Sequence, residues 1–207
     1  MRAHSILMGR RAHSNTMPIP ERLRLKPVSS DLVEELSELC SAIEQELESG
    51  GTAEELLERW HRHSRRPVGP FEFRTYWKAV DQETFVREAL NPPPAFDATA
   101  VYSEAIEVLA ALQAVEVDES EEAYYLGWLE EQFPGGNMSD LIYWPDRWFE
   151  DASLFRHPNG AFKPEASLSN DQLVAYAMAV SGRHLSGAPD NVPLPFPVPK
   201  RRTVIHG

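Results

Sequence analysis

Few residues in this 207-residue chain have the types and spacing that catalysis or metal binding requires. His61 and His63 are two positions apart, so on a helix they point to different sides and cannot chelate one metal ion. The glycine pair at 135–136 lacks the Lys-Ser/Thr that completes a phosphate-binding loop. No serine stands in a Gly-x-Ser-x-Gly pattern. We therefore predict that the chain is not an enzyme and holds no cofactor or metal.

The remaining reactive groups point the same way. Cys40 is the single cysteine, so no internal disulfide forms, and its apolar neighbours predict a buried thiol in a reducing cytoplasm. Glu130 and Glu131 are interpreted as part of a solvated acidic face. An enzyme would need a polar pocket that unites His157, His184 or the carboxylates near Tyr143, and this stays open as an alternative.

The segment Ser139-Asp140-Leu141-Ile142-Tyr143-Trp144-Pro145 carries the most specific pattern. We expect a short helix over residues 140–144, capped by Ser139 and ended by Pro145. A helix of one turn needs support from its flanks, because helix propensity alone does not stabilise it. Tyr143 and Trp144 are large rings with few rotatable bonds, which suits them as anchors for a partner protein. The equally weighted alternative is that both rings fill the domain core.

The elements around this segment are all expected to be helices, since no stretch alternates with period two. Asp118 or Ser120 starts a helix that runs to Phe133, after an amphipathic helix over residues 99–115. Ser169 begins a capping box that opens the last helix, with Gly182 just after its end. Residues 146–168 are expected to form a long loop, functional or mobile.

The N-terminal part predicts further helices over residues 31–49, from a Thr52 capping box to Trp60, and from Asp81 to Leu90. Ser30 is expected to cap the helix over residues 31–49. One or two further helical turns are expected at 71–80. The prolines at 92–94 mark a boundary. Four parts result: a disordered basic tail (1–28), an N-terminal helical subdomain (29–95), a second helical domain (96–186) and an extended Pro-rich tail (187–207). Met17 is an alternative to Met1 as the translation start.

The segment at 139–145 resembles the Ser-Asp-Leu-Ile-Tyr-Tyr-Pro signature of the colicin E-type and S-type pyocin immunity proteins. The resemblance covers roughly residues 96–185 and includes the order of helices around the motif. It implies a four-helix antiparallel bundle that binds a bacteriocin nuclease domain beside its active centre and excludes the DNA substrate. Trp144 stands where the family has a second tyrosine, the loop after Pro145 is longer, and residues 1–95 have no counterpart.

The resemblance also implies which residues contact the partner. The common anchor consists of Ser139, Asp140, Tyr143, Trp144 and Pro145, with Glu130 contributing from the preceding helix. An ungapped count places the partner-selecting positions at Glu119, Glu122, Ala123, Leu126 and Gly127.

Charge fits a basic partner. The net charge is −12, although residues 1–28 carry six Arg or Lys against one Glu, so the middle of the chain is more acidic than the whole. Such a body repels nucleic acid and attracts basic proteins. We therefore expect a cytoplasmic immunity protein that inhibits a cognate toxin, with no nucleic-acid or membrane partner. The alternative is a helical regulatory module that binds a protein other than a toxin.

Overall fold

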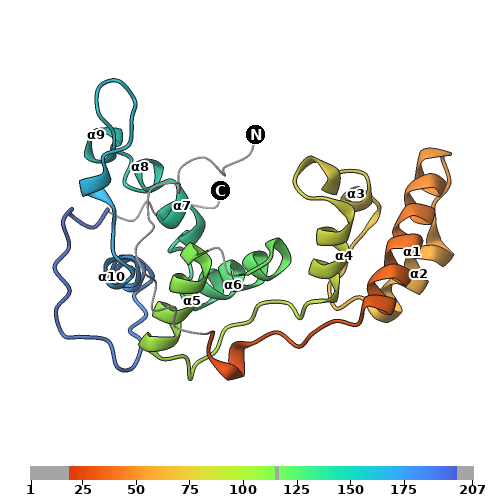
Figure 1. Ribbon diagram of the computed structural model, residues 1–207, viewed down its shortest axis with the longest axis horizontal. Helices are drawn as coiled ribbons and strands as arrows, with labels where there is room; N and C mark the ends of the chain where they lie inside the picture. The colour runs from red at the N-terminus through yellow and green to blue at the C-terminus, as the bar shows by residue number, and fades with distance from the viewer. Residues whose placement is uncertain (1–18, 115–116, 200–207) are drawn as a thin grey trace, which may run out of the picture.

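The fold is all-α, as the sequence predicts. A computed structural model describes residues 19–114 and 117–199. In these ranges there are ten α-helices and three short 3-10 helices, and the extended pairing is limited to two isolated bridges. Figure 1 shows α1–α4 grouped at one end of the molecule and α5–α10 at the other, with two segments of chain crossing between them.

The N-terminal group packs around one hydrophobic cluster, which extends from Val33 to Leu90. At its centre the buried Trp60 ring meets the edge of Phe73, with 4.9 Å between ring centroids. The elements of this group are α1 (Ser30–Glu48), α2 (Glu54–His63), α3 (Pro70–Phe73), η2 (Tyr76–Lys78) and α4 (Gln82–Leu90). Cys40 is buried, as expected, and burial raises the pKa of its thiol to about 11.

Two of the expected caps in this group are wrong. Ser29, rather than Ser30, caps α1 and accepts from the Leu32 amide. The Thr52 capping box does not form, because α2 begins after Ala53, which adopts a left-handed conformation (φ 53°) and is buried. The chain has to reverse direction within a few residues after α1, and Ala53 packs into the core at the position where a polar cap was expected.

The C-terminal group has its own, larger cluster, formed mainly by residues between Ala100 and Leu185. The Ser169 capping box forms as expected, and Gly182 ends the last helix at φ 72°. Of the two expected starts for the preceding helix, Asp118 is the cap, and it forms a capping box with Glu121. The elements are α5 (Tyr102–Ala114), α6 (Glu119–Gln132), α7 (Met138–Tyr143), α8 (Pro145–Trp148), α9 (Ala152–Phe155), η3 (Pro164–Ala166) and α10 (Asn170–Ser181).

Residues 146–168 do not form a long open loop. They contain α9, η3 and most of α8, and Phe149 and Phe155 are buried in the C-terminal cluster. Phe149 meets the Tyr176 ring edge-on, with 4.9 Å between centroids. The apolar rings in this segment therefore extend the core instead of leaving the segment unanchored.

Of the two tails, the N-terminal one is more ordered than expected where it is described. Residues 19–28 belong to the fold, because η1 (Glu21–Leu23) buries Leu23 in the C-terminal cluster and Arg22 pairs with Asp97 and Glu104. Residues 1–18 of the expected disordered tail lie outside the described residues. Residues 191–199 form no helix or strand, and the Phe196 carbonyl accepts from the Tyr176 hydroxyl at 2.7 Å.

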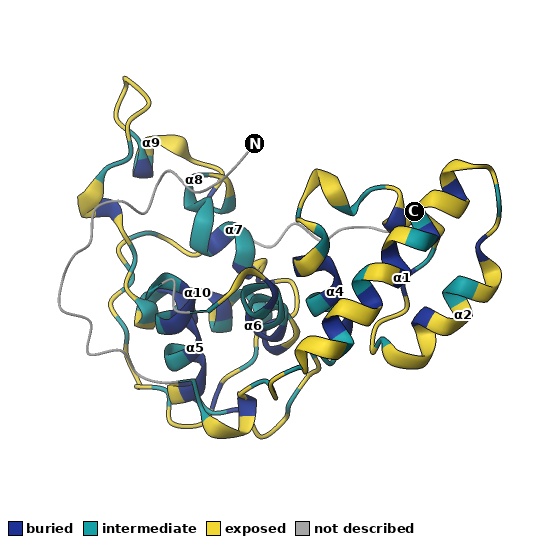
Figure 2. Ribbon diagram, turned by 45° about the vertical axis from the view of Figure 1, so that its right-hand side comes forward, coloured by how far each residue is buried: buried dark blue, intermediate teal, exposed yellow. Residues whose placement is uncertain are grey.

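Helix α6 connects the two groups. It packs against α5 and α7 within the C-terminal group and against α4 of the N-terminal group. Figure 2 shows α4 and α6 facing each other between the two ends of the molecule, with buried positions on both. Asn91, just after α4, donates from Nδ2 to the Ser120 carbonyl at 3.3 Å, and both residues are buried. The face of α6 that is free for a partner is therefore limited by the chain itself.

Candidate partner-binding surface on α6, α7 and α8

The motif at 139–145 forms α7 and the first residue of α8. Asn137, not Ser139, caps α7, and its side chain accepts from the Asp140 amide. Asn137 has a left-handed backbone (φ 48°), which asparagine tolerates better than most residues and which follows from the turn at Gly135 and Gly136. Asp140 lies in the first turn of α7, where a negative charge is favourable.

Ser139 is held by α6 instead. Its amide donates to Glu130 Oε1 at 2.9 Å, so the end of α6 fixes the start of α7. Burial raises the pKa of Glu130, although the amides of Ser139 and Met138 act in the opposite direction by stabilising the carboxylate. Two of the residues that the resemblance implies, Glu130 and Ser139, are thus in direct contact.

Tyr143 is fixed by α6 as well. Its hydroxyl donates to Glu122 Oε1 at 2.6 Å, a short bond to a charged acceptor. Burial, followed by the bond to Glu122, raises the pKa of the Tyr143 hydroxyl. The ring is therefore neutral and oriented before any partner arrives, which lowers the entropy lost on binding.

Trp144 lies at the junction of two helices. It ends α7, and Pro145 is the first residue of α8, so Pro145 begins a second helix as well as ending the first. The Arg147 guanidinium lies 4.8 Å from the centroid of the Trp144 ring, within the range of a cation–π contact. The sequence interpretation missed Arg147, although its spacing of three from Trp144 would have indicated the contact.

Neither ring belongs to the core. Tyr143 and Trp144 are both half-buried, and neither is part of the C-terminal cluster or of the partly buried residues packed against it. The buried members of the motif region are Met138 and Leu141. The alternative in which both rings simply fill the core is therefore wrong.

The positions on α6 that the resemblance implies for partner selection have different surroundings. Glu122 faces Tyr143, whereas Leu126 is partly buried against the C-terminal cluster. Ala123 and Gly127 line a cavity of about 200 Å³ at the junction with the N-terminal group. A Cβ atom on Gly127 would lie 2.7 Å from Pro94 Cγ, so the Pro94 ring covers this position.

No family model, no curated protein and no solved structure matches this chain. The family relationship therefore remains a prediction that depends on the motif at 139–145.

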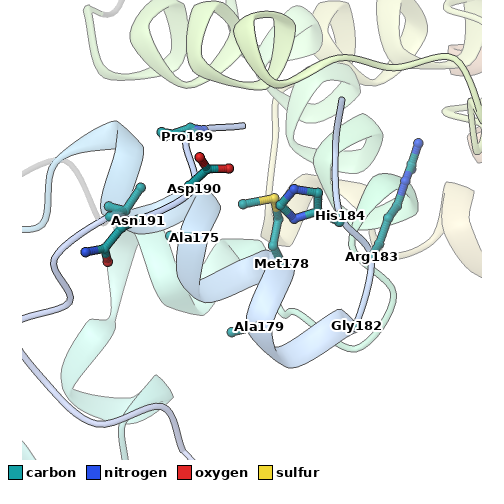
Figure 3. Close-up of a pocket in the computed structure, with 10 residues that line it drawn as sticks. Ala175, Met178, Ala179, Gly182, Arg183, His184, Pro189, Asp190 and Asn191 are labelled. Carbon is teal, nitrogen blue, oxygen red and sulfur yellow. The ribbon is translucent and has the colours of Figure 1, made fainter. Parts of the chain in front are cut away.

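The residues of the enzyme alternative are not brought together. His184 lines a cavity of about 410 Å³ beside the end of α10, and neither His157 nor Tyr143 contributes to that lining. Figure 3 shows His184 and Met178 on one side of this cavity and Asp190 and Asn191 on the other. Within residues 19–114 and 117–199, no group of three or more His, Cys, Asp or Glu side chains is arranged to hold a metal ion.

The described part of the chain also shows no helix with the length and apolar content that crossing a bilayer requires. The surface formed by Glu122, Glu130, Asp140, Tyr143 and Trp144 offers three carboxylates and two aromatic rings. Glu122 is bonded to Tyr143, and the Arg147 guanidinium lies over the Trp144 ring. We call this surface the Tyr143 patch. Its chemistry suits recognition of a basic protein surface, because the rings supply apolar contact and the carboxylates pair with Lys or Arg.

Proposed function

We propose that this protein is a cytoplasmic immunity protein that inhibits a cognate bacteriocin or related toxin domain by binding it in equimolar amount. The observation that carries the proposal is the placement of Tyr143 and Trp144, which lie outside the core, with the Tyr143 hydroxyl bonded to the Glu122 carboxylate of α6. The partner has a basic surface, as a nuclease domain that binds DNA does.

The order of the helices supports the same reading. Two longer helices, α5 and α6, precede the short α7, and α10 follows as the last helix. This is the order that the resemblance implies for a four-helix immunity protein, with α8 and α9 as an insertion before the last helix. The rings of α8 and α9 extend the C-terminal core, while Arg147 of α8 lies over the Trp144 ring.

Electrostatics support a basic partner. Helix α6 contains five glutamates and no Lys or Arg. Charges of one sign along the helix that carries the patch accelerate the encounter with an oppositely charged protein and disfavour partners of like charge. The acidic surface also carries the same sign of charge as the nucleic acid that such a toxin binds. The inhibitor and the nucleic acid therefore compete for the same positively charged surface of the toxin.

The test begins with a pull-down from the organism that encodes the chain, with the purified protein as bait and mass spectrometry to identify the captured protein. The affinity of the captured protein is then measured for three forms of the chain. These are the unchanged chain, the double variant Tyr143→Ala/Trp144→Ala, and the matched control Phe71→Ala/Trp77→Ala. Phe71 and Trp77 are 73% and 64% exposed on the N-terminal group, so the control removes two rings far from the patch.

We expect capture of a basic toxin domain in near 1:1 amount. Loss of two anchors should weaken its binding by at least a hundredfold, since each hot-spot residue contributes about 2 kcal/mol or more, while the control binds normally. Circular dichroism verifies that each variant is folded. Unchanged toxin binding by the folded Tyr143→Ala/Trp144→Ala variant would refute the proposed surface, and capture of a regulatory protein instead would favour the interaction-module alternative.

A further inference from the structure

The cavity between α6 and the N-terminal group has walls from both halves of the chain. Ala123, Tyr124 and Gly127 contribute from α6, and Arg66, Glu88 and the Asn91–Pro94 turn contribute from the other side. The cavity volume is about 200 Å³, which is enough for one large side chain. The Pro94 ring packs directly on Gly127, where a Cβ atom would lie 2.7 Å from Pro94 Cγ, and both residues line the cavity.

About half of this lining is apolar, and Ser120 adds to its polar part. Tyr124 is half-buried, and burial raises the pKa of its hydroxyl, so the group stays neutral. Pro92, Pro94 and Ala123 add methylene and methyl groups. Such walls suit the hydrocarbon stem of a long side chain.

One wall carries a charge that is only weakly paired. The Glu88 side chain is 20% exposed, and its ion pair with Arg66 spans 3.4 Å, longer than a well-formed charged hydrogen bond. Burial raises the pKa of Glu88 despite Arg66, and the charge of Glu119 acts in the same direction as burial. The Arg66 side chain is 45% exposed, so this contact is screened by solvent and easily exchanged.

We propose that this cavity receives one arginine or lysine side chain of the partner, with its stem against Tyr124 and the prolines and its charged end at Glu88. The inference rests on the proposed function and extends it to the N-terminal half. Residues of that half then take part in choosing the partner, because a partner without a basic residue at this position leaves Glu88 with Arg66 alone. Arg66 is the internal competitor that the partner's side chain displaces.

The first experiment needs no toxin. N-acetyl-arginine methylamide is titrated into the full chain, and the amide resonances of Asn91 and Gly127 are followed by NMR. The citrulline analogue, which has nearly the same shape and no charge, is the reference ligand. We expect saturable shifts with the arginine compound, weak or absent shifts with citrulline, and loss of the response in Glu88→Gln.

Two arginine variants distinguish binding inside the cavity from a general change in the charge of the protein. Arg66→Ala removes the internal competitor and should tighten binding of the arginine compound by about threefold or more, as expected for a partly exposed charge pair. Arg65→Ala removes the same charge one residue away. Among the described residues, Arg65 is bonded through its backbone amide, to the Ala89 carbonyl. Equal effects of Arg66→Ala and Arg65→Ala, or equal shifts with arginine and citrulline, would overturn the proposal.

The toxin then distinguishes this inference from the proposed function. Glu88→Gln should weaken toxin binding by about tenfold, the loss expected for one charged pair at an interface. Normal toxin binding by Glu88→Gln, with loss in Tyr143→Ala/Trp144→Ala, would end the inference and leave the proposed function standing. Conversely, the chain could bind the arginine compound through Glu88 and yet capture no toxin. That result would support the site for a basic side chain and reject the immunity role.

Discussion

Arg22 offers the sharpest test of how the N-terminal segment is fixed. Its guanidinium donates to both carboxylate oxygens of Glu104 and to Asp97, which lie more than 70 residues later in the chain. The Glu104 side chain is only 12% exposed, whereas Arg22 is 41% exposed. The substitution Arg22→Ala removes these bonds and leaves Glu104 with the Val101 amide as its remaining donor among the described residues.

The magnitude follows from the exposure of the partners. A hydrogen bond to a charged group contributes about 1.5–3 kcal/mol, whereas an exposed ion pair contributes about 0.2–1 kcal/mol. The Glu104 contact is bidentate and largely buried on one side, so we expect a loss of about 2 kcal/mol in the free energy of unfolding. For a chain of this length that loss corresponds to a decrease of about 4–8 °C in Tm.

The pH dependence gives a second measure. Bonds from the Thr99 hydroxyl and from Arg22 lower the pKa of Asp97 to about 2. At Glu104 burial is the largest single effect and acts to raise the pKa, but the bonds from Arg22 and the Val101 amide together with the Arg22 charge outweigh it and lower the pKa. Both carboxylates therefore contribute stability that is present above their ordinary pKa values of 3.8 and 4.5 and is lost as the pH falls toward about 2. In Arg22→Ala this acid-sensitive part of the stability should be smaller.

Urea denaturation at pH 7 and at several values down to pH 2 measures both effects. Lys26→Ala is the matched control, because it removes one exposed positive charge from the same segment and Lys26 forms no ion pair among the described residues. If Arg22→Ala and Lys26→Ala agreed within about 0.5 kcal/mol, as surface substitutions do, the Arg22 contacts would not stabilise the fold.

Two further predictions concern packing and ionisation. Gly127→Ala should destabilise the fold by about 1 kcal/mol despite the better helix propensity of alanine, because its Cβ would lie 2.7 Å from Pro94 Cγ; the added change Pro94→Ala should restore stability in urea denaturation. The six tyrosines all have pKa values raised above 10, with burial as the first cause, so folding favours their neutral form and this stability is lost as the pH rises above 10. Phenolate absorbance should therefore rise together with the loss of helical circular dichroism, and a smooth titration near pH 10 in the folded protein would contradict the burial of these rings.

The helices were predictable where local chemistry decides them. Asp81, Asp118 and Ser169 each cap a helix as their spacing indicates, and Gly182 ends the last one. These signals act over three or four residues, so they need no knowledge of the tertiary structure. The expected cap at Ser139 was wrong. Asn137 precedes Asp140 by three residues, the spacing of a helix cap, and its side chain accepts from the Asp140 amide. The Ser139 amide instead donates to Glu130, a contact between two helices that local spacing does not indicate.

Long-range contacts were beyond the sequence. Residues 19–28 have the composition of a basic tail, and only the pairing of Arg22 with two distant carboxylates shows that they are anchored. Trp60 was expected only as part of the second helix, and its environment of Phe73 and Phe85 depends on how α3 and α4 fold back on α2. At the candidate surface, the sequence supplied Tyr143 and Trp144 but not the covering of Gly127 by Pro94, which is a contact between the two halves of the chain.

The two surfaces proposed for binding meet on α6. Glu122 bonds to Tyr143 on one side, and its neighbour Ala123 lines the cavity with Glu88 on the other. Consecutive helical residues are about 100° apart on a helix roughly 10–12 Å wide, so a single protein surface approaching Glu122 also reaches the mouth of the cavity. A partner of ordinary interface size, about 800 Å² per side, would cover both. The N-terminal helices would then have two roles. They would support α6 through its contact with α4, and they would supply part of the recognition surface that an immunity protein without residues 1–95 would lack.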